Sequence, residues 1–194
     1  MKKYTILVLT SAFVFTLFNT HAQTDETLFG RSGLKLTGAW GGSNIGLTSF
    51  DNENALLRGG FGGLEFNKEV LIGLGGVRTD EAVTFDNNGR QDEFKLDFGG
   101  LYVGYVPRSF QVIHPKFSFL TGGGKVKVNG EDDDNIFVFQ PAGGAEVNVF
   151  RWFKLGIEGG YRFVSGTDFD RLKDDDLSSF FVEMKFRFGW SWGR

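Results

Sequence analysis

The closing stretch of the chain, residues 180–192, alternates apolar and polar positions. From Val182 onward every second residue is apolar and the residues between are charged, polar or small. The apolar set reads Val182, Met184, Phe186, Phe188, Trp190 and Trp192. A period of two puts the two sets on opposite faces of a β-strand. The length suits the roughly 9–11 tilted residues of a transmembrane strand, so the pattern predicts apolar side chains toward lipid and polar ones toward a lumen.

Related alternation predicts seven strands upstream of this one, which makes eight in all. Their approximate ranges are 34–49, 55–66, 70–85, 94–106, 117–128, 137–149 and 153–163. The connections after the second, fourth and sixth strands are short, whereas the others are longer and more acidic. Outer-membrane barrels show this asymmetry, with short periplasmic turns and longer outer loops.

The fifth strand does not keep a single phase. Phe117 and Phe119 share one face, but Val126 and Val128 lie at the opposite parity. If all four face lipid, the phase must shift between them. We therefore expect a β-bulge near the glycines at 122–124, because an extra residue in one strand reverses the facing of every later residue in that strand.

Two other strands decide which charges face inward. The apolar positions of the fourth strand share the face that we assign to lipid, which turns Lys95 and Asp97 toward the lumen. In the second strand, Arg58 and Glu65 cannot both face the lumen of one regular strand. The facing of the second strand stays open.

The amino-terminal residues predict export. Lys2 and Lys3 precede an uncharged apolar run over residues 6–18, and a small-residue motif ends at Ala22. These are the parts of a secretory signal peptide, so we expect residues 1–22 to be cleaved and residues 23–194 to form one domain. Removing both lysines lowers the formal net charge from −3 to −5, which gives no electrostatic basis for binding nucleic acid.

Composition agrees with a curved, lipid-facing sheet. The chain contains 29 Gly and 23 Phe but no Cys, so it has no disulfide framework and no thiolate metal site. An aromatic content of 16% argues against a disordered chain. Glycine doublets recur in seven consecutive strand candidates, where they permit sharp curvature and leave space inside a narrow lumen.

With these features the chain resembles the small eight-stranded outer-membrane β-barrels of the OmpA-membrane-domain and OmpX type. The resemblance covers nearly all of residues 23–194 and is most specific in the closing strand. It implies an all-β, antiparallel, up-and-down transmembrane barrel, inserted by the barrel-assembly machinery through that strand. Members of this group usually end on an aromatic residue, whereas here Trp190 and Trp192 are followed by Gly193 and Arg194.

The predicted lumen carries charges of both signs. We expect these residues to form ion pairs that plug it, because buried charges need partners and an eight-stranded barrel is narrow enough for side chains to fill. The expected inward set is Lys35, Lys95, Asp97, Glu146, Lys154, Glu158, Arg162, Glu183, Lys185 and Arg187.

The sequence offers little catalytic chemistry. Lipid A deacylases use this kind of barrel with a histidine and a serine near the outer leaflet, but His114 follows an expected periplasmic turn. We interpret His114 as an interfacial or turn residue and expect no catalytic residue and no cofactor.

Two acidic runs, at 131–134 and 174–176, carry oxygen ligands that suit divalent cations. Neither has the spacing of a calcium loop, so we interpret them as solvated loop tips and assign no metal site. Bridging of anionic lipid headgroups by divalent ions through these runs stays open.

The function expected from these patterns is structural or surface-interacting. We expect a monomeric, non-enzymatic protein of the Gram-negative outer membrane, whose partners are membrane lipid and the assembly machinery. A small channel or carrier for hydrophobic ligands is one alternative. A soluble periplasmic barrel of the lipocalin kind is another.

Overall fold

The computed structural model describes residues 33–50, 53–87, 90–128, 134–167 and 174–192. The signal peptide expected at 1–22 lies outside these ranges. No helix in the described ranges is long and apolar enough to cross a membrane.

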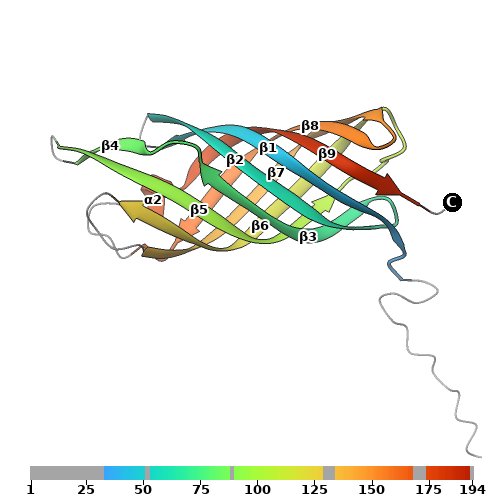
Figure 1. Ribbon diagram of the computed structural model, residues 1–194, viewed down its shortest axis with the longest axis horizontal. Coiled ribbons are helices and arrows are strands. Elements are labelled where there is room, and N and C mark those ends of the chain that lie inside the picture. Colours follow the sequence, from blue (N-terminus) through green and yellow to red (C-terminus); the bar gives the residue numbers. More distant parts are fainter. Residues whose placement is uncertain (1–32, 51–52, 88–89, 129–133, 168–173, 193–194) are drawn as a thin grey trace, which may run out of the picture. The chain divides into compact units, whose positions relative to one another are not determined.

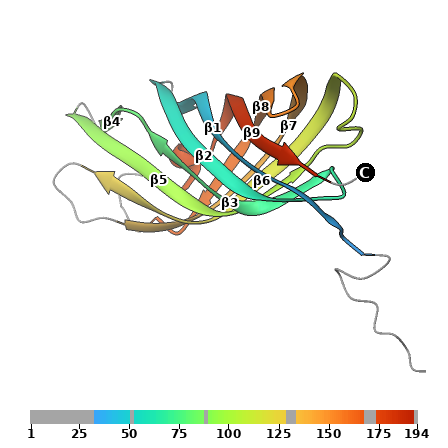
Figure 2. The same ribbon diagram turned by 45° about the vertical axis from the view of Figure 1, so that its right-hand side comes forward.

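The described chain is a closed sheet of antiparallel strands (Figures 1 and 2). Its elements are β1 (Leu36–Phe50), β2 (Glu53–Phe66), β3 (Val70–Thr79), β4 (Val83–Asn87), β5 (Arg90–Tyr105), β6 (Ile113–Val128), β7 (Asp134–Phe150), β8 (Phe153–Ser165), α2 (Asp174–Leu177) and β9 (Ser179–Ser191). Neighbours in sequence pair with one another except β3 and β4, which both pair with β5; β1 pairs with β9, and the β3–β5 pairing closes the ring. The predicted eight-stranded, all-β, up-and-down barrel is confirmed.

The third predicted strand is interrupted. Instead of running from 70 to 85, it ends at Thr79 and resumes at Val83, so β3 and β4 share one position beside β5. At the break the amide of Asp80 donates to the carbonyl of Leu56 at 2.9 Å. Its carboxylate lies 3.0 Å from Arg58 on β2. These contacts hold the break against β2.

The barrel has two ends, which we name by their connections. At the turn end lie the β2–β3, β5–β6 and β7–β8 turns, together with the start of β1 and the end of β9. The opposite end is the loop end. The β2–β3 turn spans residues 67–69, and in it Asn67 and Lys68 both have positive φ, 52° and 62°. This left-handed pair matches the twist of the strands, and asparagine tolerates it well.

The bulge predicted near residues 122–124 is absent, and that prediction is wrong. The register of β6 with β5 and β7 runs through these glycines without a shift. Val126 and Val128 are instead buried inside the barrel, on the same face as His114 and Lys116. The apolar side of the strand thus changes from outside to inside along its length, while the backbone keeps its phase.

This change divides the interior into two zones. Near the loop end the interior is apolar, as in a soluble protein. Its buried residues include Phe50, Leu57, Val77, Phe94, Leu96, Phe98, Val126, Val128, Ile136, Val138 and Val164. The helix α2 adds Leu177, which is fully buried in the same cluster. Nearer the turn end the interior contains most of the buried charge.

The α2 segment is fixed at the loop end by hydrogen bonds to Asp174. The hydroxyl and amide of Thr167 donate to its carboxylate at 2.5 and 2.9 Å. The hydroxyl of Ser178 donates to its backbone carbonyl at 2.8 Å. The bond from the Thr167 hydroxyl lowers the pKa of Asp174 below its ordinary value.

The glycines of neighbouring strands meet across the sheet. Gly75 lies opposite Gly100, which lies opposite Gly122, and we call these three the glycine row. A Cβ on Gly100 would lie well under 3.0 Å from the carbonyl oxygen of Thr121, and one on Gly122 would lie equally close to that of Gly99. Heavy atoms cannot approach so closely, so β5 and β6 can coil together here only because Gly100 and Gly122 lack side chains.

Candidate functional site

The candidate site is a set of charged side chains inside the barrel, which we call the ionic cluster. It consists of His114, Lys116, Glu146, Glu158, Glu183, Lys185 and Arg187. All come from β6, β7, β8 and β9, where alternation points every second residue inward. All are buried.

Glu146 has the most partners in the cluster. Its Oε1 accepts from Arg187 Nη2 at 2.6 Å and lies 3.2 Å from His114 Nε2, while its Oε2 lies 3.2 Å from Lys116 Nζ. The other ring nitrogen of His114 donates to the Gln111 carbonyl at 2.9 Å. Both ring nitrogens of His114 therefore lie within hydrogen-bond distance of an oxygen acceptor.

Glu158 links the two lysines of the cluster. Its Oε1 lies 2.9 Å from Lys116 Nζ, and its Oε2 accepts from Lys185 Nζ at 3.0 Å and from the Ser118 hydroxyl. Lys185 continues to Glu183, 3.0 Å away. The ion pairs therefore form a connected chain across the strands.

Glu183 meets a polar group from the first strand. Asn44 on β1 donates to its Oε2 at 2.6 Å. Nearer the turn end, Ser191 donates to Glu65 at 2.6 Å and accepts from the Trp40 indole at 3.2 Å. These contacts tie the closing strand to β1 and β2 from the inside.

Aromatic rings of β1, β2 and β5 face the cations from across the barrel. Arg187 Cζ lies 4.6 Å from the centre of the Trp40 ring, and Lys185 Nζ lies 5.1 Å from that of Tyr102. Lys116 Nζ lies 5.5 Å from that of Phe61. Cations over ring faces at such distances are attracted by the ring quadrupole. One side of the interior thus supplies charge and the other side supplies rings.

Arg162 lies where the charged and apolar zones meet. It is fully buried, its Nε donates to Gln140 at 3.0 Å, and its guanidinium lies 5.4 Å from the ring centres of both Phe50 and Phe98. Within the described part of the chain no carboxylate forms an ion pair with it. Its two Nη atoms are buried and have no hydrogen-bond partner among the described residues.

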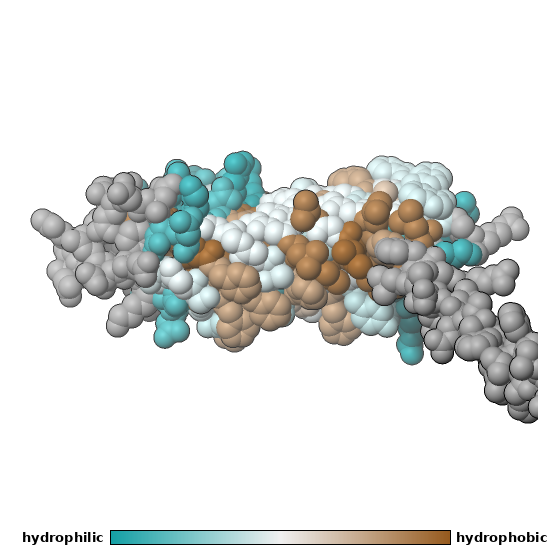
Figure 3. Space-filling view, turned by 90° about the horizontal axis from the view of Figure 1, so that it is seen from below, coloured by the Kyte–Doolittle hydropathy of each residue, from teal (hydrophilic) through white to brown (hydrophobic). Residues whose placement is uncertain are grey.

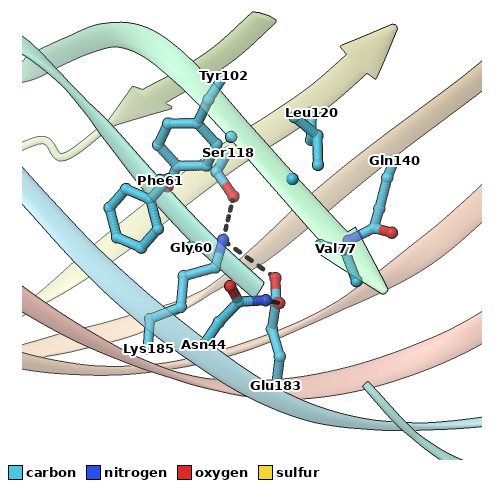
Figure 4. A pocket seen from close by; sticks show the side chains of 12 residues that line it. Asn44, Gly60, Phe61, Val77, Tyr102, Ser118, Leu120, Gln140, Glu183 and Lys185 are labelled. Atoms are coloured by element: carbon cyan, nitrogen blue, oxygen red, sulfur yellow. Dashed lines mark hydrogen bonds and ion pairs between the residues drawn. The ribbon is translucent and has the colours of Figure 1, made fainter. Parts of the chain in front are cut away.

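A small internal cavity adjoins this cluster (Figure 4). Its volume is about 20 Å³, and its wall includes Asn44, Tyr102, Ser118, Glu183 and Lys185. Figure 4 shows Lys185 reaching toward Ser118 and Glu183, with the rings of Phe61 and Tyr102 beside them. A cavity of this size holds about one water molecule.

The structure places most of the expected inward residues in the interior, but three lie elsewhere. Glu146, Lys154, Glu158, Arg162, Glu183, Lys185 and Arg187 are buried. Lys35, Lys95 and Asp97 are exposed, so their assignment to the lumen is wrong. In β5 the inward face near the loop end belongs to Phe94, Leu96 and Phe98, which lie in the apolar zone.

The second strand, whose facing was open, places Glu65 inside and Arg58 outside.

Sequence reasoning missed Lys116 as a member of the ionic cluster, and it took His114 for an interfacial or turn residue although the side chain is 2% exposed. The available signal was parity, because 114, 116 and 118 alternate with the outward-facing Phe117.

The outer surface bears a belt of apolar side chains over the middle and turn half of the barrel (Figure 3). Exposed members include Leu47, Leu64, Leu74, Leu101, Phe117, Phe139, Ile157 and Phe163. The outward set of the closing strand, Val182, Met184, Phe186, Phe188, Trp190 and Trp192, lies on the outer surface. Near the loop end the surface of β2, β3, β5 and β6 is instead charged, with Arg58, Arg78, Lys95, Asp97, Lys125 and Lys127 exposed.

The described residues contain no group of three or more His, Asp or Glu side chains placed to hold a metal ion. Of the two acidic runs, residues 131–133 lie outside the described ranges. Asp174 to Asp176 form the first turn of α2. Divalent binding at either run stays an untested expectation.

Comparison with known proteins finds similarity in structure only. No family model and no curated protein matches the sequence. Neisserial surface protein A (NspA) superposes with a TM-score of 0.56 at 12% identity, over 80% of this chain and 98% of NspA. The N-terminal β-barrel domain of Pseudomonas aeruginosa OprF gives 0.48 at 11% identity, over 78% and 97%. The Yersinia pestis attachment invasion locus protein Ail gives 0.40 at 15% identity, over 79% and 96%. The resemblance drawn from the sequence is therefore confirmed at the level of the fold: this chain is a closed eight-stranded barrel like those of the small outer-membrane proteins.

Proposed function

We propose that this chain is a non-enzymatic protein of the Gram-negative outer membrane with a structural or surface-interaction role, and that side chains plug its lumen. The observation that carries the proposal is the arrangement of polarity over the turn half of the barrel. There the outer surface is apolar while the interior holds a paired ionic cluster. Lipid is the solvent that makes this arrangement favourable.

The size of the apolar belt supports a membrane location. Soluble monomers rarely expose contiguous apolar patches beyond a few hundred Å². Here large apolar side chains are exposed on every strand from β1 to β9 except the short β4, of which only the side chains of Val83 and Thr84 are described. Trp152, Trp190 and Trp192 lie at the turn end, where interfacial tryptophans of a barrel are expected.

The packing of the interior favours a plug over a pore. Glu146, Glu158 and Arg187 are each at most 2% exposed and are held by short ion pairs. The cavity beside them has room for about one water molecule. A permeant solute would have to break several buried ion pairs, which is costly in a low-dielectric interior.

The lipocalin-like alternative fits less well. A soluble barrel that carries a hydrophobic ligand needs an apolar pocket inside and a polar wall outside. In the turn half of this chain the interior is charged and the outer surface is apolar. In the loop half the apolar interior is filled by packed side chains such as Phe50 and Phe94, whose ring centres lie 5.2 Å apart.

Fractionation of a Gram-negative host that expresses the full chain tests the location. We expect the protein in the outer-membrane fraction, with faster gel migration before boiling than after it. Recovery of folded protein in the detergent-free periplasmic fraction would contradict the proposal.

Planar-bilayer recording tests the plug separately. We expect no steady conductance from the folded protein, because the ionic cluster spans the interior. A stable open state under these conditions would favour the channel alternative while leaving the membrane location intact.

A further inference from the structure

A second and larger cavity opens at the turn end. Its volume is about 590 Å³, and it lies between the β7–β8 turn and the last residues of β9. Trp40, Phe150 and Trp190 supply aromatic walls, while Arg151 and Lys154 supply positive charge. Small-molecule sites typically have about 300–1,000 Å³ and combine apolar walls with a few polar groups, so the cavity has the size and composition of such a site.

Lys154 is a cation of the cavity wall that forms no ion pair with any described carboxylate. Its side chain is 7% exposed, and its Nζ lies 4.8 Å from the centre of the Trp40 ring. Lys116, Lys185 and Arg187 each contact a carboxylate. Among the described residues no carboxylate forms an ion pair with Lys154.

The neighbourhood of Lys154 increases the need for negative charge. Arg187 lies directly opposite it across β8 and β9, and the Arg187 guanidinium lies over the same Trp40 ring. Like charges opposite one another destabilise a strand pair. Glu146 compensates Arg187, whereas a buried ammonium without a partner is unfavourable. An anion in the cavity would relieve both effects.

Asn148 on the same wall adds an acceptor. Its amide nitrogen donates to the carbonyls of Ser109 and Gln111 at 2.8 and 2.7 Å. Its Oδ1 is buried and receives no hydrogen bond from the part of the chain that the structure describes.

We propose that the turn-end cavity binds a small organic anion, a carboxylate or phosphate carried on an aromatic or apolar body. The anionic group pairs with Lys154 and Arg151, and the body packs against Phe150 and Trp190. This proposal goes beyond the structural role and does not depend on it, because it uses only the turn-end residues.

Titration with a matched pair of small probes tests the proposal. The protein in zwitterionic lipid nanodiscs is titrated calorimetrically with 4-phenylbutyrate and with its neutral amide, against empty discs. We expect the acid to bind at least about tenfold more tightly than the amide, because a charge-assisted contact is lost in the amide. Equal affinities, or no binding of the acid, would overturn the proposal even if the membrane location holds.

Variants separate the site from general attraction of anions. Lys154→Gln is expected to weaken acid binding about tenfold or more, while Lys154→Arg, which keeps the charge, and Lys95→Gln, on the outer wall, stay within about threefold of the parent. If Lys154→Gln does not fold, the affinities of the parent protein for the acid and for the amide still test the proposal.

Repeating the titration with phenyl phosphate, and in discs that contain anionic lipid, distinguishes the sources of the anion. Competition by the anionic lipid would assign the site to a headgroup. Unchanged binding of the acid would assign it to a free solute. Parent-like acid binding by a folded Lys154→Gln variant would refute the site.

Discussion

Lys116, Arg187 and the imidazole of His114 converge on one fully buried carboxylate, that of Glu146. Such a group contributes little net stability compared with an apolar filling of the same volume, because each charge loses its hydration. Removal of one member, in contrast, lowers the stability, because it leaves the remaining charges buried without a partner. The ionic cluster should therefore tolerate no single neutralisation at its centre.

Glu146→Gln is expected to lower the free energy of unfolding by about 3–5 kcal/mol, the usual effect of breaking a buried pair from one side. Denaturant titration of the refolded protein in detergent, followed by tryptophan fluorescence, measures it. The double variant Glu146→Gln/Arg187→Gln should lose less than the sum of the single losses, because the side chains touch at 2.6 Å.

The exposed pair of Arg58 and Asp80 serves as the control. Both side chains contact solvent at the loop end, and Asp80→Asn should change the free energy of unfolding by less than about 1 kcal/mol. Strict additivity in the Glu146 and Arg187 cycle would mean that these two residues are not coupled.

At the residue scale, parity alone predicted most of the interior. Glu146, Glu158 and Glu183 each adjoin at least one outward-facing apolar residue, so their inward direction follows from the period of two. The predictions failed for Lys95 and Asp97 because an apolar face was taken to mean a lipid face. That rule holds only along the part of a strand that lies within the belt.

At the scale of the strand, one observation explains both failures. In β5 and β6 the apolar face is inside near the loop end and outside near the turn end, with no break in register. The sequence of a single strand is compatible with two causes of this change of apolar face. One is a β-bulge, and the other is a change in what the outer face contacts, from lipid to water. The register of the neighbouring strands decides between them, and it comes only from the folded sheet.

Arginine substitutions on the outer face of β5 test where lipid begins. Leu101 and Asp97 point outward on the same strand, four residues apart. Leu101→Arg places a cation in the apolar belt, where it costs about 2–4 kcal/mol near the bilayer midplane, so assembly should fall sharply. Asp97→Arg should assemble like the parent. Equal tolerance of both would mean that the belt does not face lipid.

The glycine row permits a second test at this scale, with adjacent residues as matched controls. Gly122→Ala would place a Cβ well under 3.0 Å from the Gly99 carbonyl, whereas a Cβ on Gly123 has its nearest neighbour at 3.9 Å. We expect Gly122→Ala to reduce the free energy of unfolding by about 1–3 kcal/mol through overpacking, and Gly123→Ala to change it little. Denaturant midpoints of the two variants would show the difference, and identical midpoints would contradict the close approach of β5 and β6.

At the scale of the whole molecule, the barrel has one polar-walled end and one end ringed by aromatic residues. The charged outer wall near the loop end lies beyond the apolar belt, and Trp152 and Trp190 lie at the other end. Combined with the long acidic connection between β8 and β9 at the loop end, residues 166–178, this polarity predicts that the loop end faces outward from the cell.

The absence of cysteine makes this orientation easy to test, because every introduced thiol is unique. Lys127→Cys lies near the loop end and Arg151→Cys lies in the β7–β8 turn. On intact cells, a membrane-impermeant maleimide should label Lys127→Cys and leave Arg151→Cys unlabelled until the cells are broken. The reverse pattern would invert the orientation.

The length of β6 sets how far the barrel wall extends beyond the apolar belt. Its 16 residues extend about 50 Å along the strand, or about 40 Å along the barrel axis at a tilt near 40°. The apolar band of such barrels is only about 25 Å tall, which leaves about 15 Å of wall on the loop side. This part of the wall encloses the apolar interior near the loop end, so it is rigid. It would hold the strand ends above the lipid headgroups, where a large soluble macromolecule could approach them without touching the bilayer.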